Sequence, residues 1–389
     1  PPYDFPFTAV DVLLVVDDSG SMNEEQQIFA TSIYNLVNSL VAPLPGSMWE
    51  AADDVRVAVV SSNMGLSWGG NPYETGDGWP NDQIPPGCGS VGDDGVFQVY
   101  DNWKEIRLNS GQIVCDASNE QCPSGWDCEQ IGDEGVGVCV APSGDGDDLD
   151  CPTLGDESWA ETVPQEPNGD LAMQVACLSS LGTQGCGFEQ QLSAAARALE
   201  REDQQSFIRE EALLGVILVS DEEDCSVESN DLFAVEEVQD QSAGKVNVAC
   251  GNNEELLYSP TAFYQRMIDA KGGVVGGVVF GAIVGVPPVA ACQGLGDEIG
   301  TCLEHDKMQE VEQVEETASG SEAVFFRPAC SREEDGELLT KARPGRRFVS
   351  LAQSFGDGGY VYSICNADWT PAMEDMAKII TARLADSSD

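Results

Sequence analysis

The sequence VDVLLVVDDSGSM, residues 10–22, joins a short apolar run to a polar loop. The apolar part, Val10 to Val16, is typical of a strand buried inside a parallel sheet. Four further runs of this kind follow: Val55 to Val60, Leu214 to Val219, Val278 to Val284 and the shorter Tyr360 to Ile364. Segments of helical period lie between and after them: Glu24 to Leu40, Phe188 to Glu200, a helix opened by Ser259-Pro260 and closed by Gly272, and a last helix carrying Met373, Met376, Ala377, Ile380 and Leu384. Strands that alternate with helices predict an α/β fold, with a doubly wound, mostly parallel sheet flanked by helices.

The polar loop after the first run has the composition of a cation site. A carboxylate at Asp17 is followed at +2 and +4 by the hydroxyls of Ser19 and Ser21. Gly20 eases the tight turn between them, so three oxygen donors can surround one point, as hard divalent cations require. Ligand sites of α/β sheets also form here, beyond the carboxyl ends of the strands. The alternative is that Ser21 or Asn23 only caps the helix that follows.

Two later segments offer oxygen donors to the same point. The third apolar run ends in Ser220-Asp221-Glu222-Glu223-Asp224, and Asp221 approaches Asp17 if the two strands are neighbours. Between them, the glycine-rich loop from Gly182 to Gly187 offers one hydroxyl at Thr183, just before a segment of helical period. We therefore take Asp17, Ser19, Ser21, Thr183 and Asp221 as the candidate metal ligands.

The charge of the chain excludes several classes of partner. Among 389 residues, 68 are Asp or Glu and only 18 are Lys or Arg, which gives a net charge of −50. Such a chain repels phosphate backbones and anionic membrane surfaces, so nucleic acid is excluded as a partner. A medium rich in salt or divalent cations suits it, because screening relieves the self-repulsion. For Asp18 and the run from Glu222 to Asp224, we favour a solvated acidic rim over additional metal ligands.

Fourteen cysteines, none in C-x-x-C spacing, and a single histidine favour disulfides over zinc sites. Disulfides persist in oxidising compartments, so we expect a secreted or cell-surface protein. Spacing suggests the local pairs Cys225–Cys250 and Cys292–Cys302. Cys177 and Cys186 flank the Thr183 loop, and we hypothesise a bridge between them that limits the freedom of that loop.

Two irregular regions, residues 66–170 and 286–347, interrupt the alternation of strands and helices. The first is rich in Gly, Asp, Pro and Cys, and too poor in aliphatic residues to form a core without disulfides. We interpret both as insertions in one domain that spans residues 1–389.

The uncharged run 272–293 is interrupted by Pro287-Pro288, so it predicts a buried strand and its exit loop rather than a membrane span. No signal peptide is visible at Pro1-Pro2-Tyr3-Asp4, and a lipid anchor upstream is left open.

The pattern of Asp17, Ser19 and Ser21, then a threonine, then Asp221 resembles the von Willebrand factor type A domain with its metal-ion-dependent adhesion site. The resemblance covers residues 9–65 and 182–384, which include the predicted sheet and its helices. Thr183 is the best match for the family's threonine. It implies that serines and threonine form a hydroxyl cradle while the aspartates hold the cation directly or through water. The cation, Mg²⁺ or alternatively Mn²⁺ or Ca²⁺, keeps one position for an acidic group of a partner.

Three short segments, GCGFEQ, SDEEDC and SIC-x-x-DW, resemble segments of surface lipoproteins of myxobacteria and their relatives. They lie at Gly185 to Gln190, Ser220 to Cys225 and Ser363 to Trp369. We therefore expect an extracellular or cell-surface adhesin, which could be an outer-membrane lipoprotein. Its expected partner is a protein or surface ligand that offers a carboxylate. The alternative is a structural surface or assembly protein in which the cation and the disulfides only stabilise the fold. An enzyme is not expected, because the sequence lacks G-x-S-x-G and H-E-x-x-H and has one histidine.

Overall fold

The computed structural model describes residues 7–384 except 48, 69–70, 73–87, 90–91, 101–103, 110–111, 117–120, 132–135, 142–147, 155–157, 164–167, 240–243 and 317–319. Within these ranges, seven strands form one central sheet in the order β10-β2-β1-β11-β12-β18-β13. The five inner strands are parallel to one another, whereas β10 and β13 at the two edges are antiparallel to the strands beside them. The bounds of these strands are β1 Ala9–Val16, β2 Val55–Ser61, β10 Ala160–Glu161, β11 Ala212–Ser220, β12 Val278–Val284, β13 Gly294–Leu295 and β18 Gly359–Ser363.

The apolar runs form the inner strands because each is covered on both faces. Every residue of β1, β11 and β12 is buried. All five strands predicted from apolar runs are confirmed, within one or two residues at their ends. The strand in the uncharged run 272–293 is β12, and no helix in the described part of the chain is long and apolar enough to cross a membrane.

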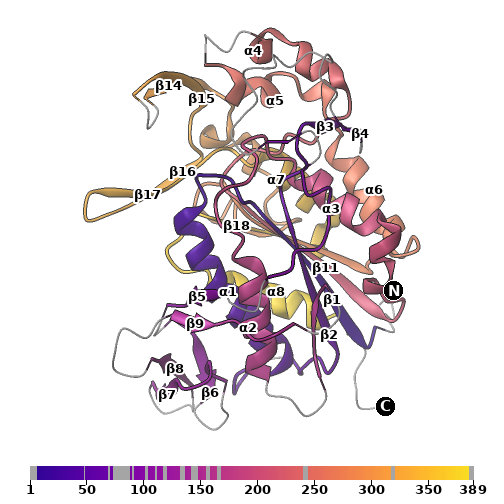
Figure 1. Cartoon of the computed structure of the whole chain (residues 1–389), viewed down its shortest axis with the longest axis vertical. Helices are drawn as coiled ribbons and strands as arrows, with labels where there is room; N and C mark the ends of the chain where they lie inside the picture. Colours follow the sequence, from indigo (N-terminus) through magenta and orange to yellow (C-terminus); the bar gives the residue numbers. More distant parts are fainter. Residues whose placement is uncertain are drawn as a thin grey trace.

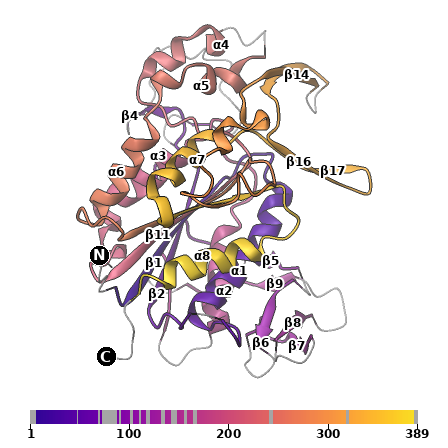
Figure 2. The same ribbon diagram turned by 180° about the vertical axis from the view of Figure 1, so that it is seen from behind.

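Helices lie on both faces of the sheet (Figures 1 and 2). On one face, apolar side chains of α1, α2 and α8 join the core, and on the other those of α3, α6 and α7. The predicted helices are confirmed except at two boundaries. Helix α3 begins at Gln191, so residues 188–190 belong to the preceding loop, and α8 ends at Thr381, before Leu384. Helices α2 and α7 and the short helices α4 and α5 were not predicted. The bounds are α1 Asn23–Val41, α2 Asn168–Ser179, α3 Gln191–Glu200, α4 Glu236–Gln239, α5 Ala249–Asn252, α6 Pro260–Ala270, α7 Arg346–Phe355 and α8 Thr370–Thr381.

The two predicted insertions form small sheets around the central one, although each also gives it an edge strand, β10 from the first and β13 from the second. The hairpin β16–β17 reaches away from the body in both views, on the side where α1 begins, whereas β6, β7 and β8 lie at the far end from α4 and α5 (Figures 1 and 2). The small-sheet strands are β3 Ser67–Trp68, β4 Asn71–Pro72, β5 Glu105–Arg107, β6 Val114–Asp116, β7 Asp127–Gln130, β8 Val136–Val140, β9 Asp148–Asp150, β14 Glu312–Glu316, β15 Glu322–Phe326, β16 Cys330–Glu334 and β17 Glu337–Ala342.

All fourteen cysteines, each within the described ranges, are paired in seven disulfides. The expected pairs Cys225–Cys250 and Cys292–Cys302 are confirmed, and such a density of bridges suits an extracellular or secreted protein. The hypothesised bridge between Cys177 and Cys186 is wrong. Cys177 lies in α2 and pairs with Cys151 of the first insertion, while Cys186 pairs with Cys88, so both bridges tie the insertion to the main fold. The remaining pairs are Cys115–Cys128, Cys122–Cys139 and Cys330–Cys365.

Candidate metal centre

The candidate ligands gather where the strand order of the sheet reverses. From β1 the chain goes first to β2 on one side and later to β11 on the other, and both pair with β1 in parallel. The three strands therefore end at the same edge, and polar residues follow each of them: Asp17 after β1, Ser62 after β2 and Asp221 after β11. Such a reversal leaves a crevice at the carboxyl ends of the strands, which is the usual ligand position in open α/β sheets.

Asp17 is completely buried, and hydrogen bonds from three elements hold its carboxylate. Oδ1 accepts from the amide of Ser19 at 2.9 Å and from the hydroxyl of Ser62 at 3.4 Å. Oδ2 accepts from the hydroxyl of Ser220 at 2.6 Å, and that hydroxyl in turn accepts from Nε2 of Gln191 at 2.8 Å. The carboxylate is thus fixed in orientation before any ligand arrives.

The two serine hydroxyls connect the loop after β1 to Asp221. The Oγ atoms of Ser19 and Ser21 lie 3.2 Å apart, and Ser21 donates to Oδ1 of Asp221 at 3.1 Å. Asp17, Ser19, Ser21 and Asp221, which we call the four-residue cluster, therefore form one continuous hydrogen-bonded group. The alternative role of Ser21 or Asn23 as a helix cap is wrong, because α1 begins at Asn23, after Met22, and no side chain caps it.

The electrostatics of the cluster are unfavourable without a cation. Burial raises the pKa of Asp17, although hydrogen bonds from Ser220 and Ser19 oppose the shift. Burial, with the negative charges of Glu222, Asp17 and Glu25, raises the pKa of Asp221 well above its usual range. Buried carboxylates that repel one another favour protonation or the arrival of a cation.

The expected solvated acidic rim is wrong for two of its four members. Asp18 is buried, and this burial, with the charges of Asp17 and Asp93, raises its pKa to about 7. Asp224 is also buried, where it accepts from the amide of Leu192 at 3.0 Å and pairs with Arg347 at 2.9 Å. Asp224 therefore anchors the start of α3 to the end of β11, a structural role that the acidic run alone did not reveal.

Thr183 lies in the loop that was expected to supply it, but its hydroxyl is not joined to the four-residue cluster by any hydrogen bond among the described residues. The loop itself is close. The amide of Gly185 donates to the carbonyl oxygen of Asp18 at 2.8 Å, and Gln26 of α1 exchanges two hydrogen bonds with the backbone of Gly182. A side chain at residue 185 would collide with the Asp18 carboxyl group, since a Cβ there would lie 2.2 Å from its Cγ. Only glycine permits this approach.

The residue that sequence reasoning missed is Glu189. It was assigned to the helix, whereas it ends the loop before α3 and is only 8% exposed. Burial and the negative charges of Asp17, Glu222 and Asp221 raise its pKa well above the usual range, although a hydrogen bond from its own backbone amide opposes the shift. It stands two residues before Gln191, the first residue of α3, so a helical period that was taken to begin at Phe188 included it.

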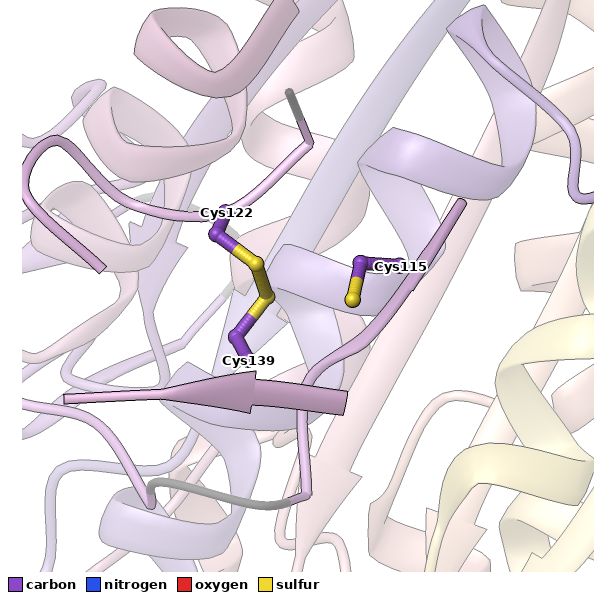
Figure 3. Close-up of side chains that lie close together, drawn as sticks. All are labelled: Cys115, Cys122 and Cys139. Atoms are coloured by element: carbon purple, nitrogen blue, oxygen red, sulfur yellow. A yellow bond between two sulfur atoms is a disulfide. The ribbon is translucent and has the colours of Figure 1, made fainter. Parts of the chain in front are cut away.

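The donor set is a mixture of carboxylates and hydroxyls. In the described part of the chain, no three carboxylate oxygens from different residues lie within 4.8 Å of one another. Only the sulfurs of Cys115, Cys122 and Cys139 come that close, and Figure 3 shows why they form no metal site: Cys122 and Cys139 are bonded to each other. Cys115 is bonded to Cys128, so no thiolate is left. The oxygen-rich strand ends remain the candidate metal centre.

Neither a protein-family model nor a curated protein sequence matches this chain.

Proposed function

We propose that the chain is a cell-surface or secreted adhesin of the von Willebrand factor type A kind, with a doubly wound sheet. It binds an acidic group of its partner through a divalent cation at the four-residue cluster. The observation that carries this proposal is the hydrogen-bonded chain from Asp17 through Ser19 and Ser21 to Asp221. Two carboxylates and two hydroxyls suit Mg²⁺, Mn²⁺ or Ca²⁺.

The residues have separate roles in this mechanism. Asp17 and Asp221 supply negative charge from buried positions, while Ser19 and Ser21 supply neutral oxygens. When bound, the cation would attract a carboxylate from the partner. Gly20 and Ser21 are exposed, so a carboxylate can approach from their side of the loop. Because the chain carries a net charge of −50, its overall field repels an anionic partner group, and a bound cation would supply a local attraction.

The resemblance to myxobacterial surface lipoproteins gives this proposal a biological setting. The gliding-motility adhesin CglB serves as the functional model, with an outer-membrane location through a lipid anchor upstream. Enzymatic activity forms no part of the proposal.

The test measures cation binding and partner binding separately. Mg²⁺, Mn²⁺ and Ca²⁺ are titrated by calorimetry into chelator-treated full-length chain, alongside Asp17→Asn and the double variant Ser19→Ala/Ser21→Ala. We expect one saturable site that both variants lose. Ser354→Ala, an exposed serine in α7, is the matched control and retains the site. Saturable binding that survives in both variants contradicts the proposal.

Adhesion is then measured on beads coated with carboxylate-bearing peptides, with and without chelator. If chelator abolishes adhesion while the circular dichroism spectrum stays unchanged, the result supports the proposal of an adhesin. The structural alternative, favoured by the complete burial of Asp17, predicts instead that chelator lowers the melting temperature and that no carboxylate surface is bound.

A further inference from the structure

Gln26 of α1 joins two loops at the carboxyl ends of the strands. Its Nε2 donates to the carbonyl oxygen of Asp17 at 2.9 Å and to that of Gly182 at 2.8 Å, and its Oε1 accepts from the amide of Gly182 at 2.9 Å. Side chains of a helix lean toward its N-terminus, so position 26, near the start of α1, reaches back to the loop that precedes the helix. One side chain thus connects the loop after β1 with the loop that carries Thr183.

These three hydrogen bonds need a carboxamide. Gln26 is 7% exposed, and it faces two carbonyl oxygens and one N–H group. A carboxamide has two N–H donors and an oxygen acceptor, whereas the carboxylate of a glutamate only accepts and would bring a negative charge against two carbonyl oxygens. Methionine has a similar length but no strong donor or acceptor. Of these three side chains, only glutamine fits the groups around it.

The Thr183 loop is fixed at a second point as well. The amide of Gly185 donates to the carbonyl oxygen of Asp18 at 2.8 Å. The two anchors of the loop therefore reach Asp17 and Asp18, which are consecutive in the chain. Only residues 183 and 184 lie between the anchored positions 182 and 185, so Thr183 is held beside the loop after β1.

We infer that Gln26 is a positioning residue of the cation site: it holds the Thr183 loop in place, so that the Thr183 hydroxyl acts on the bound cation, directly or through one water. The inference rests on the proposed function. The Asp17 carboxylate does not depend on Gln26, because hydrogen bonds from other residues already orient it. The effect of Gln26 on the cation therefore passes through Thr183.

Gln204 provides a matched control at the other edge of the sheet. Its Nε2 donates to the carbonyl oxygens of Gly95 and Ala198 at 3.0 and 3.2 Å, and its Oε1 accepts from the amide of Phe97 at 2.8 Å. It is also 7% exposed, so it repeats the bonding and the burial of Gln26. Gln204 precedes β11 whereas Gln26 follows β1, and since these strands are parallel, the two side chains lie at opposite edges.

The experiment measures Mg²⁺ and Ca²⁺ binding by calorimetry on the chelator-treated full chain. Gln26→Met and Gln204→Met each remove three hydrogen bonds and should lower the melting temperature by similar amounts. We expect Gln26→Met to weaken cation binding by about tenfold and Thr183→Ala to cost about as much. Gln204→Met should stay within about twofold of the wild type. In a chain that already carries Thr183→Ala, Gln26→Met should cost less than about threefold, because the group through which it acts is gone.

Three results overturn the inference: a Gln26→Met affinity within about twofold of the wild type, a Thr183→Ala affinity within the same range, or an equal loss from Gln26→Met with and without Thr183. If Gln26→Met does not fold, hydrogen exchange of the wild type followed by NMR decides. Cation should then slow exchange of the Gly182 amide by at least about fivefold and leave the Phe97 amide, which donates to Gln204, unchanged. A Gly182 rate that does not respond to cation overturns the inference.

Asp17→Asn separates this inference from the proposed function. If Asp17→Asn abolishes cation binding while Gln26→Met binds like the wild type, the proposed function stands and Gln26 has no positioning role. If Asp17→Asn binds both cations like the wild type, the proposed function fails, and this inference fails with it.

Discussion

Ser220 and Asp17 are joined by a hydrogen bond of 2.6 Å, from the Ser220 hydroxyl to Oδ2 of Asp17, although 203 positions separate them in the chain. The bond crosses from the end of β11 to the end of β1. It belongs to a relay, because Nε2 of Gln191, at the start of α3, donates to the same hydroxyl. Three elements thus fix the orientation of one buried carboxylate. Such support around a metal ligand usually matters for affinity as well as for stability.

Replacing Ser220 by Ala tests this support. The variant removes the hydroxyl that donates to Oδ2 of Asp17 and accepts from Nε2 of Gln191, while every oxygen of the four-residue cluster is retained. We expect the affinity for divalent cations to fall by about 10–100-fold, measured by calorimetry on the chelator-treated chain. Ser354→Ala is the control. An affinity equal to that of the wild type would mean that Asp17 needs no orientation by its neighbours.

A second prediction concerns the salt bridge between Glu315 of β14 and Arg343, which follows β17. Arg343 donates from its side chain to both oxygens of Glu315, at 2.8 and 3.2 Å, and from its amide to the carbonyl oxygen of Asp221 at 2.8 Å. Glu315 therefore holds the segment that lies against the metal centre. Burial favours the protonated form of Glu315, but hydrogen bonds from Arg343, Lys341 and Gln313 outweigh it and lower the pKa to about 2.

The sign of the pH dependence follows from that lowered pKa. The folded state binds the Glu315 proton more weakly than the unfolded state, so this group stabilises the fold above pH 4.5 and loses its contribution as the pH falls toward 2. We expect Glu315→Gln to lower the free energy of unfolding by about 2 kcal/mol at pH 7 and by almost nothing near pH 2. Urea unfolding at both pH values measures it. A difference between variant and wild type that does not depend on pH would contradict the prediction.

The sheet was predictable from the sequence because a short run of neighbouring residues specifies each inner strand. An apolar run such as Val278 to Val284 has one stable environment, the interior of a parallel sheet, and β12 occupies these very residues. The loop after β1 was equally readable, since Asp17, Ser19 and Ser21 are close in the chain and their spacing alone brings their oxygens together. These parts of the site needed no knowledge of distant contacts.

The rest of the site depends on contacts that no spacing encodes. Glu189 has the sequence environment of a helix, but backbone hydrogen bonds to Cys225 and Ser62 hold it in a loop over β1. Asp224 was placed on a solvated surface, whereas Arg347, 123 positions later, neutralises it in the interior. The partner of Cys186 lay 98 positions away rather than in α2. In each case a long-range partner decides the environment of the residue.

The bridge between Cys88 and Cys186 leads to a third prediction. It ties the start of the 186–190 loop to the first insertion, so it limits the movement of Glu189 and of the loop beside Asp18. Replacing both cysteines by serine should lower the free energy of unfolding by about 3–5 kcal/mol, as expected for a long closed loop, and should weaken cation binding. Thermal melting and calorimetry report the two effects.

The matched control removes the Cys292–Cys302 bridge, which spans ten positions far from the metal centre in sequence. This variant should lose less stability and keep the affinity of the wild type. Equal affinity in both variants would show that the loop holds its position without a disulfide. Peptide mapping under non-reducing conditions tests the pairing itself: a fragment that links Cys177 to Cys186 would contradict the structure.

The last prediction contrasts Asp11, within β1, with Asp17, which directly follows that strand. Asp11 near the start of β1 is completely buried, and it accepts from the amide and the side chain of Arg209 at 2.7 and 2.9 Å. Asp11→Ala leaves the Arg209 charge with only Asp54, which is half exposed, so we expect a loss of about 3 kcal/mol in urea unfolding. Asp11 and Asp17 are six positions apart along extended chain, about 20 Å, so cation affinity should not change in Asp11→Ala. Asp17→Asn removes a buried charge that no cation opposes in the metal-free chain. It should therefore leave metal-free stability equal or higher while abolishing cation binding. If Asp11→Ala weakened cation binding as strongly as Asp17→Asn, the effect of Asp17→Asn would reflect damage to β1 rather than loss of a ligand.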